Sequence, residues 1–229
     1  MTENENANAN ANANVAEPPP RKSNAKAQVI FVIVGIVLGV GLLFRSVIKN
    51  HRQKLPDKLG KVADFTFLER SGKNLALSDL KGEVWVASFI FTRCSGPCQK
   101  VSASMSQIHH DPELKGLKLV TFTVDPEHDS VNVLAEYAES ARADTKNWFF
   151  LTGKKEKIHE LIFKSFKLPV EEAKPGSQPI GEQFAHSPRL VLVDREGHIR
   201  GYYSSKDPMK VRDLKSAAIG LLSASPKVS

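Results

Sequence analysis

The only two cysteines of the chain, Cys94 and Cys98, lie within one short stretch, FTRCSGPCQK. Isolated cysteines usually serve as small core hydrophobes, whereas a close pair after a buried strand indicates shared chemistry. A C-x-x-x-C pair can clamp one soft metal ion or close a disulfide, and a purely stabilising disulfide would gain little over so short a loop. Because the amides at a helix N-terminus lower a thiol pKa, we expect reactive thiolates here.

A third ligand would separate metal binding from disulfide exchange. Among the seven histidines, His186 lies in FAHSPRLVLVD, directly before a buried strand, where a loop can reach a neighbouring strand-to-helix junction. Two sulfurs and one imidazole nitrogen suit copper, especially Cu(I), and can also hold Cu(II). Zinc usually takes a fourth ligand, and the sequence offers no clear one. We therefore predict that Cys94, Cys98 and His186 bind one copper ion.

The hydrophobic pattern predicts the elements that must position these residues. We expect strands over 64–69, 83–91, 118–125, 147–151, 189–194 and 198–205, and helices over 100–110, 131–141, 155–166 and 207–222. This alternation predicts an α/β domain with a mixed central sheet flanked by helices. The cysteine loop then lies at the carboxyl end of the parallel strands, where sites of open α/β sheets gather. Met105 falls on the helix face expected to be buried, so we assign it to the core rather than to copper.

The N-terminal region differs from this domain. Residues 1–25 are a low-complexity run of Asn, Ala and Glu, which predicts a disordered tail. The apolar run at 29–44, extended by its flanks, predicts a single transmembrane helix over 26–48, although sixteen helical residues cover only about 24 Å. A cleaved signal peptide is the alternative, but no small-x-small cleavage pattern follows the run. A basic linker occupies 49–60.

The net charge of +7 is concentrated beside this predicted membrane span. Between residues 45 and 61 six basic side chains stand against Asp57 alone, a local net charge of +5. A basic segment at a membrane surface explains this distribution better than a nucleic-acid-binding face does, so we expect no nucleic-acid partner.

Three motifs taken together resemble the Sco/SenC family of membrane-anchored, thioredoxin-like copper proteins that help assemble the binuclear copper centre of cytochrome c oxidase. They are FTRCSGPCQKVSASM, VDPEHDS at 124–130 and FAHSPRLVLVD. The resemblance covers roughly 61–222 and implies a thioredoxin-like copper-binding domain over 61–225. It places the copper ligands at Cys94, Cys98 and His186, and it implies that the two cysteines can cycle between a dithiol and a disulfide.

The D-P-x-x-D element of the family maps onto Asp125 and Asp129. The resemblance suggests that these carboxylates tune the copper site or meet a partner. The residues alone permit a simpler interpretation, in which Asp125 ends a strand and Asp129 caps the next helix. The chain also departs from the family, which commonly has proline after each cysteine, since Ser95 and Gln99 stand there.

The resemblance further implies a partner and a location. We expect copper delivery to the copper-receiving subunit of cytochrome c oxidase, and contacts with other copper carriers or thiol oxidoreductases. The folded domain would face the periplasm, or an equivalent extracytoplasmic space, from a single-pass anchor in the inner cell membrane. The rival hypothesis is an enzyme, a membrane-tethered thiol-disulfide oxidoreductase. In that case Cys94 attacks and Cys98 resolves, which reduces the cysteines of a copper-receiving partner.

Overall fold

A computed structural model describes residues 39, 55–94, 96–168 and 188–224. The chain divides into two units, residues 1–52 and 53–229, and of the first unit only Gly39 is described, within a helix. The predicted tail, nearly all of the predicted anchor and much of the linker therefore lie outside the described residues. Within the described ranges, no helix has the length and apolar character needed to cross a membrane.

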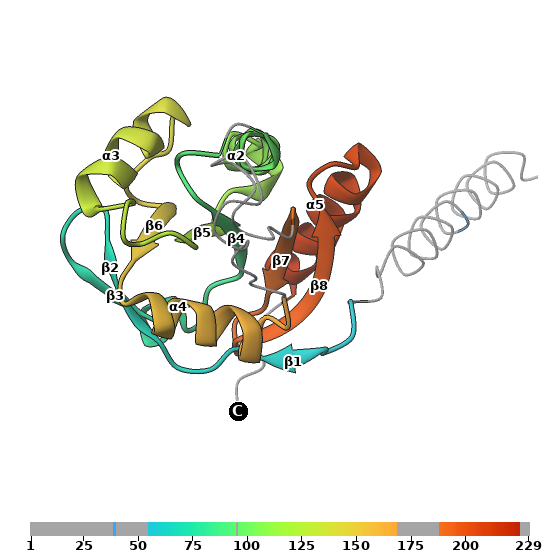
Figure 1. Ribbon diagram of the computed structural model, residues 1–229. Helices are drawn as coiled ribbons and strands as arrows, with labels where there is room; N and C mark the ends of the chain where they lie inside the picture. Colours follow the sequence, from blue (N-terminus) through green and yellow to red (C-terminus); the bar gives the residue numbers. More distant parts are fainter. Residues whose placement is uncertain (1–38, 40–54, 95, 169–187, 225–229) are drawn as a thin grey trace, which may run out of the picture. The chain divides into compact units, whose positions relative to one another are not determined.

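Eight strands form one mixed sheet in the order β1-β8-β7-β4-β5-β6-β2-β3 (Figure 1). Strands β4, β5 and β6 run parallel to one another, and every other neighbouring pair is antiparallel. This arrangement confirms the predicted α/β fold with a mixed central sheet. The strand bounds are β1 Gly60–Lys61, β2 Thr66–Glu69, β3 Asn74–Ala76, β4 Trp85–Ile90, β5 Lys118–Thr123, β6 Trp148–Thr152, β7 Arg189–Val193 and β8 His198–Ser204.

The helices cover both faces of this sheet. Figure 1 shows α2, α3 and α5 on one side and α4 on the other. Because β4, α2, β5, α3 and β6 follow one another with right-handed crossovers, α2 and α3 lie on the same face. The helices are α2 Pro97–His109, α3 Val131–Ser140, α4 Lys155–Glu160, continued by the π-helical turn η3 Leu161–Ser165, and α5 Pro208–Ser223, with 3₁₀ turns η1 Leu77–Leu80 and η2 Pro112–Leu114.

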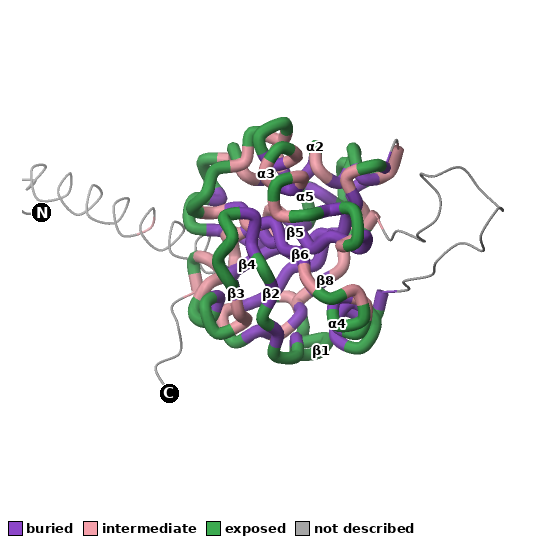
Figure 2. The backbone as a smooth tube through the Cα atoms, turned by 60° about the vertical axis from the view of Figure 1, so that its left-hand side comes forward, coloured by how far each residue is buried: buried purple, intermediate pink, exposed green. Residues whose placement is uncertain are grey.

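The core is centred on β4 and β5, whose backbone is almost entirely buried in Figure 2. Every residue of β4 is buried, as expected for a strand covered on both faces. Two polar side chains inside this layer satisfy each other, since the hydroxyls of Ser88 and Thr121 lie 2.9 Å apart. The indole N–H of Trp148 donates to the same Thr121 hydroxyl at 2.9 Å, which links β4, β5 and β6 by buried hydrogen bonds. Met105 is fully buried, as predicted.

Candidate thiol and metal site

Both cysteines lie where β4 passes into α2. Cys94 is 5% exposed and Cys98 is 1% exposed. The backbone N–H of Cys98 donates to the sulfur of Cys94 at 3.4 Å, so this sulfur takes the place of a helix N-cap. Pro97 occupies the first helical position, where its missing N–H costs nothing. Both thiols are free in this structure, and their sulfurs meet at the positive end of α2.

Burial decides the protonation of Cys98. Loss of hydration raises the pKa of its thiol well above the ordinary value, and a backbone hydrogen bond at Phe91 lowers it only in part. The expectation that the helix N-terminus produces a thiolate is therefore wrong for Cys98, because desolvation outweighs the helix amides. A metal ion or a reacting partner has to displace this proton.

Asp129 fixes the start of the cysteine loop. Its buried carboxylate accepts the backbone N–H of Thr92 at 3.1 Å and the Thr92 hydroxyl at 2.5 Å. The hydroxyl of Thr123, the last residue of β5, also donates to it. Burial raises the pKa of Asp129, although these hydrogen bonds lower it again in part. Helix α3 is capped by Ser130 instead, whose hydroxyl accepts the N–H of Val133 at 3.4 Å, so Asp129 does not act as the helix cap.

Asp125 holds the residue that precedes Cys94. Its carboxylate is 2% exposed, accepts Arg93 at 2.7 Å and lies 2.9 Å from Nδ1 of His128. Burial would raise the pKa of Asp125, but the hydrogen bonds from His128 and Arg93 outweigh it and hold the pKa below its usual value. With Nδ1–H donated to this carboxylate, the Nε2 of the half-exposed His128 has no hydrogen bond to the described residues. Carboxylates orient metal-binding histidines in the same way.

Sequence reasoning missed Thr92, Arg93 and His128. Thr92 and Arg93 directly precede Cys94, and His128 lies inside the VDPEHDS motif. Proximity in sequence to a motif was the only available signal. Of the predicted site residues, the structure places Cys94 and Cys98 together at one strand-to-helix junction, with Asp125 and Asp129 bonded to the two residues before Cys94. His186 lies outside the described residues.

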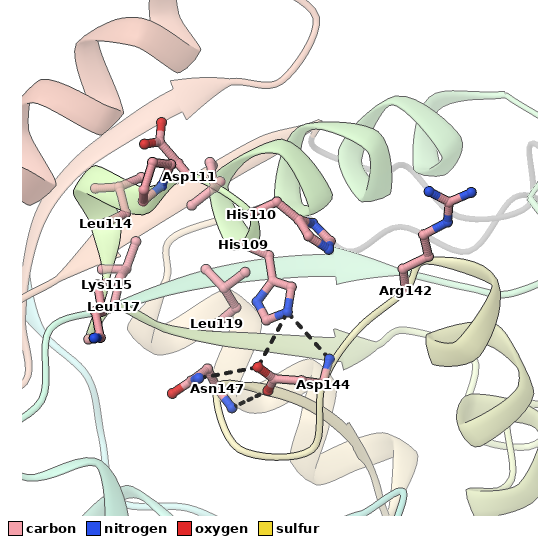
Figure 3. Close-up of a pocket in the computed structure, with 13 residues that line it drawn as sticks. His109, His110, Asp111, Leu114, Lys115, Leu117, Leu119, Arg142, Asp144 and Asn147 are labelled. Atoms are coloured by element: carbon pink, nitrogen blue, oxygen red, sulfur yellow. Dashed lines mark hydrogen bonds and ion pairs between the residues drawn. The ribbon is translucent and has the colours of Figure 1, made fainter.

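A pocket at the opposite end of α2 gathers ionisable side chains around His109 (Figure 3). The ring Nε2 of His109 accepts the backbone N–H of Asp144 at 3.3 Å and lies 3.5 Å from its carboxylate. Burial lowers the pKa of His109 more than Asp144 raises it. Eleven helical positions separate Cys98 from His109, roughly 16 Å along the axis, so this pocket is not part of the thiol site.

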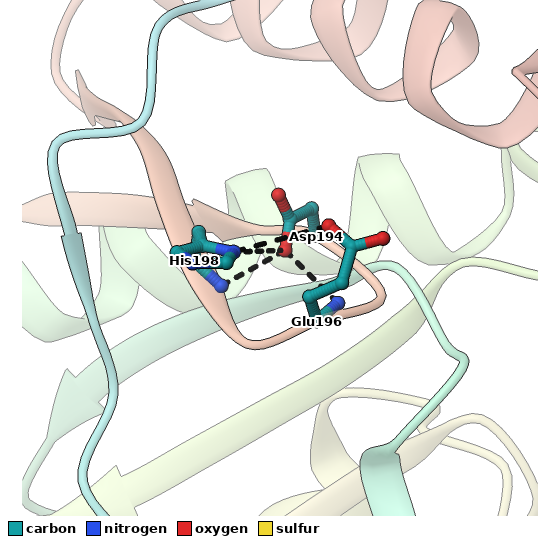
Figure 4. A group of neighbouring side chains, drawn as sticks. All are labelled: Asp194, Glu196 and His198. Atoms are coloured by element: carbon teal, nitrogen blue, oxygen red, sulfur yellow. Dashed lines mark hydrogen bonds and ion pairs between the residues drawn. The ribbon is translucent and has the colours of Figure 1, made fainter. Parts of the chain in front are cut away.

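A second cluster, Asp194, Glu196 and His198, lies at the turn between β7 and β8 (Figure 4). Its potential ligand atoms lie within 4.8 Å of one another. However, one oxygen of Asp194 already accepts the backbone N–H groups of Glu196 and His198, at 3.0 and 2.8 Å, and the other accepts Arg200 at 2.8 Å. A guanidinium beside this carboxylate disfavours a metal cation. The carboxylate of Asp194 instead stabilises the turn between β7 and β8 through its hydrogen bonds.

Comparison with known proteins identifies the class to which this fold and thiol site belong. The SCO1/SenC family profile matches residues 53–217. The chain belongs to the SCO1/SenC family, as the three motifs indicated.

Individual relatives agree with this assignment. A SCO1 protein homologue from Bacillus subtilis is 34% identical over 190 residues, which span 79% of this chain and 95% of that protein. The crystal structure of a SCO1/SenC family lipoprotein from Bacillus anthracis is 31% identical, with a TM-score of 0.62, and covers 72% of this chain and 99% of that one. The structure of BsSco is 34% identical, with a TM-score of 0.61, and covers 72% of this chain and 98% of that one. BsSco is described as having a disulfide switch and as a member of the Sco family of cytochrome c oxidase assembly proteins.

More distant Sco structures share the fold. ScoI from Bradyrhizobium japonicum, solved with copper bound, is 20% identical, with a TM-score of 0.56 over 68% of this chain and 98% of that one. At this identity the likeness concerns the fold alone.

Proposed function

We propose that this protein is a copper chaperone that holds one copper ion through Cys94, Cys98 and His186 and delivers it to the copper-receiving subunit of cytochrome c oxidase. The observation that carries the proposal is the pair of buried thiols at the N-terminus of α2, with the Cys94 sulfur accepting the Cys98 N–H. Two sulfurs on one turn form a soft donor pair, and a single imidazole completes a set suited to copper.

The surroundings of the thiols support a transfer role. Asp129 and Asp125 hold Thr92 and Arg93, so the loop that carries Cys94 starts from a fixed point. The pKa of Cys98 is raised by burial, so copper binding releases a proton and the bound ion is protected from water. Thiolate ligands can be exchanged one at a time with those of a partner, which keeps the metal bound throughout the transfer.

Relatives support the proposed process and location. BsSco, which is 34% identical to this chain, is described as a member of the Sco family of cytochrome c oxidase assembly proteins. We propose that residues 26–48 anchor this chain in the inner membrane, that 49–60 form the linker, and that a domain over 61–225 works in the periplasm or an equivalent space. The Bacillus anthracis relative is a lipoprotein, another form of membrane attachment.

Copper stoichiometry tests the proposal. The purified full chain, reduced and loaded with Cu(I), should retain one copper per chain by metal analysis after competition with a chelator. His186→Ala should lose most of this copper at the same chelator concentration, and Cys94→Ser should lose nearly all of it. His110→Ala is the matched control, since its exposed ring lies at the far end of α2. Copper retention by His186→Ala equal to that of the parent would refute the proposed ligand set.

A thiol-disulfide oxidoreductase is the second candidate. Two observations favour it, namely the free, adjacent thiols and the disulfide switch described for BsSco. The thiolate of Cys94 would attack a partner's disulfide and release one partner thiolate. Cys98 would then displace the second, so that the partner leaves as a dithiol and Cys94–Cys98 leaves as a disulfide. Full reduction of a disulfide peptide by His186→Ala, together with unchanged copper retention, would favour this enzyme.

A further inference from the structure

A cationic groove runs between α2 and α5. Its volume is about 410 Å³. Helix α2 contributes Lys100, Ser104 and Gln107, and α5 contributes Arg212 and Lys215. These residues recur at spacings of three and four along each helix, so both helices present a continuous stripe to the groove. We call this feature the α2–α5 groove.

The charge of the α2–α5 groove is of one sign. Among the described residues that line it, three are cations and none carries a carboxylate. Lys215 is held by Asp111 at 2.8 Å. Lys100 and Arg212 are exposed, and neither forms an ion pair within the described part of the chain. Lys100 on one wall of the groove and Arg212 on the other therefore give it positive charge that attracts anions.

One hydroxyl that lines the groove belongs to Ser205. This residue is 8% exposed, and its Oγ makes no hydrogen bond to any residue that the structure describes. The neighbouring Ser104 hydroxyl is already used, since it donates to the Ser205 carbonyl at 3.2 Å. A buried hydroxyl that has lost water without gaining a partner lowers stability. An oxyanion in the groove would supply the missing acceptor after a rotamer change of Ser205.

The α2–α5 groove adjoins the candidate copper site along the chain at two points. Lys100 lies in the first turn of α2, two residues after Cys98. On the other wall, the N–H of Ser205 donates to the carbonyl of Pro188 at 2.8 Å, and Pro188 follows His186 by two residues. A partner that takes copper from the candidate site would therefore meet segments of the chain that lead directly into this groove.

We propose that the α2–α5 groove docks an acidic segment of the protein that receives copper, with separate carboxylates at Lys100 and Arg212 and one within reach of Ser205. The inference rests on the proposed function, because the copper site explains why a partner would be here. The α2 stripe from Lys100 to Gln107 extends about 10 Å, which suits several carboxylates along a peptide better than one lipid phosphate. Charge complementarity of this kind orients a partner and speeds its encounter.

Binding of an acidic peptide tests the groove directly. The probe is a fluorescent peptide of alternating Glu and Ala, titrated with the full chain at low ionic strength and followed by anisotropy. The double variant Lys100→Glu/Arg212→Glu should weaken binding about tenfold or more, and added salt should abolish the difference. The matched control, Lys73→Glu/Lys81→Glu, makes the same charge change on exposed residues outside the groove and should bind nearly as the parent does. Ser205→Ala should weaken binding by about threefold without lowering the melting temperature.

The outcomes are separable. Equal loss of peptide binding in the groove and control variants would overturn the proposal, because only overall charge would then matter. Groove-dependent binding to phosphatidylserine vesicles without groove-dependent peptide binding would also overturn it, in favour of a lipid ligand. Copper retention is measured on every variant. A groove variant that retains copper but loses peptide binding supports docking at the groove. A parent chain that holds no copper refutes the proposed copper-chaperone function, and the peptide titration then reports on the groove alone.

Discussion

The carboxylate of Asp129 accepts two hydrogen bonds from Thr92, one from the backbone N–H at 3.1 Å and one from the hydroxyl at 2.5 Å. Thr92 follows β4 and Asp129 precedes α3, so the connection after β5 fixes the geometry of the loop that carries Cys94. Because Asp129 is fully buried, the loop that carries Cys94 is fixed to the core at Thr92.

Replacement of Asp129 should therefore affect both stability and copper binding. We expect Asp129→Ala to lower the free energy of unfolding by about 2–4 kcal/mol, because it leaves the Thr92 N–H without its acceptor in a buried site. Copper retention against a chelator should fall as well. Urea unfolding and metal analysis measure the two effects. Glu136→Ala, on the exposed face of α3, is the control and should change neither.

Copper retention by a His128 variant tests which imidazole completes the proposed copper site. Its side chain is 52% exposed and its contact with the Asp125 carboxylate is backed by Arg93, so His128→Ala should cost less than about 1 kcal/mol. We expect the variant to retain one copper per chain. If it lost copper as completely as His186→Ala, His128 would have to be counted among the ligands, and the proposed set would need revision.

The elements of the fold that long apolar runs encode were predictable from the sequence. The run that became β4 is buried along its whole length, and the periodic segment 131–141 became α3 with its N-cap at Ser130. The elements that were missed are short. The two residues of β1 and the three of β3 carry no periodic signal, and they form because an edge strand is already available for pairing. The predicted helix over 155–166 changes to a π-helical turn at Leu161.

The candidate site was predictable only in part for a related reason. Cysteine spacing identifies Cys94 and Cys98 because the chemistry requires two sulfurs close together in sequence. Asp125 and Asp129 also bind Arg93 and Thr92, which lie more than thirty residues away in the sequence. Ser205 is an ordinary serine in the sequence and gains its significance from burial without a hydrogen bond.

The free energy of unfolding should depend on pH through His109. Because burial lowers its pKa below the ordinary value of about 6.5, the unfolded chain binds a proton more readily than the folded protein does. The stabilising contribution is complete above about pH 6.5 and is lost as the pH falls through the lower folded-state pKa. The facing groups are Asp144, which opposes this shift, and His110 and Arg70, which reinforce it.

His109→Gln should therefore flatten the decline in unfolding free energy between about pH 7.5 and 5 relative to the parent. Urea midpoints measured across this range provide the comparison. The control is His110→Gln, whose exposed ring contacts the Ser106 carbonyl on its own helix. A decline in His109→Gln as steep as that of the parent would show that other groups carry the pH dependence.

Two neighbouring serines should respond in opposite directions to the same substitution. Ser205→Ala removes a buried hydroxyl that has no partner among the described residues, so we expect the free energy of unfolding to rise by about 0.5–1 kcal/mol. Ser104→Ala removes a donor and leaves the Ser205 carbonyl short of one hydrogen bond, so stability should fall by about 1 kcal/mol. Denaturant unfolding of both variants checks the contrast. Destabilisation by Ser205→Ala would show that its hydroxyl has a partner in solution.

The attachment of β1 to β8 determines how the domain responds to pulling from its N-terminal side. Leu59 and Val62 donate to the carbonyls of Ile199 and Gly197, and Arg200 binds the carbonyl of Pro56. These bonds follow one another along the sheet edge, so a mechanical load breaks them in sequence rather than together. The edge strand can therefore detach by local unfolding while β4, in the buried centre of the sheet, stays folded.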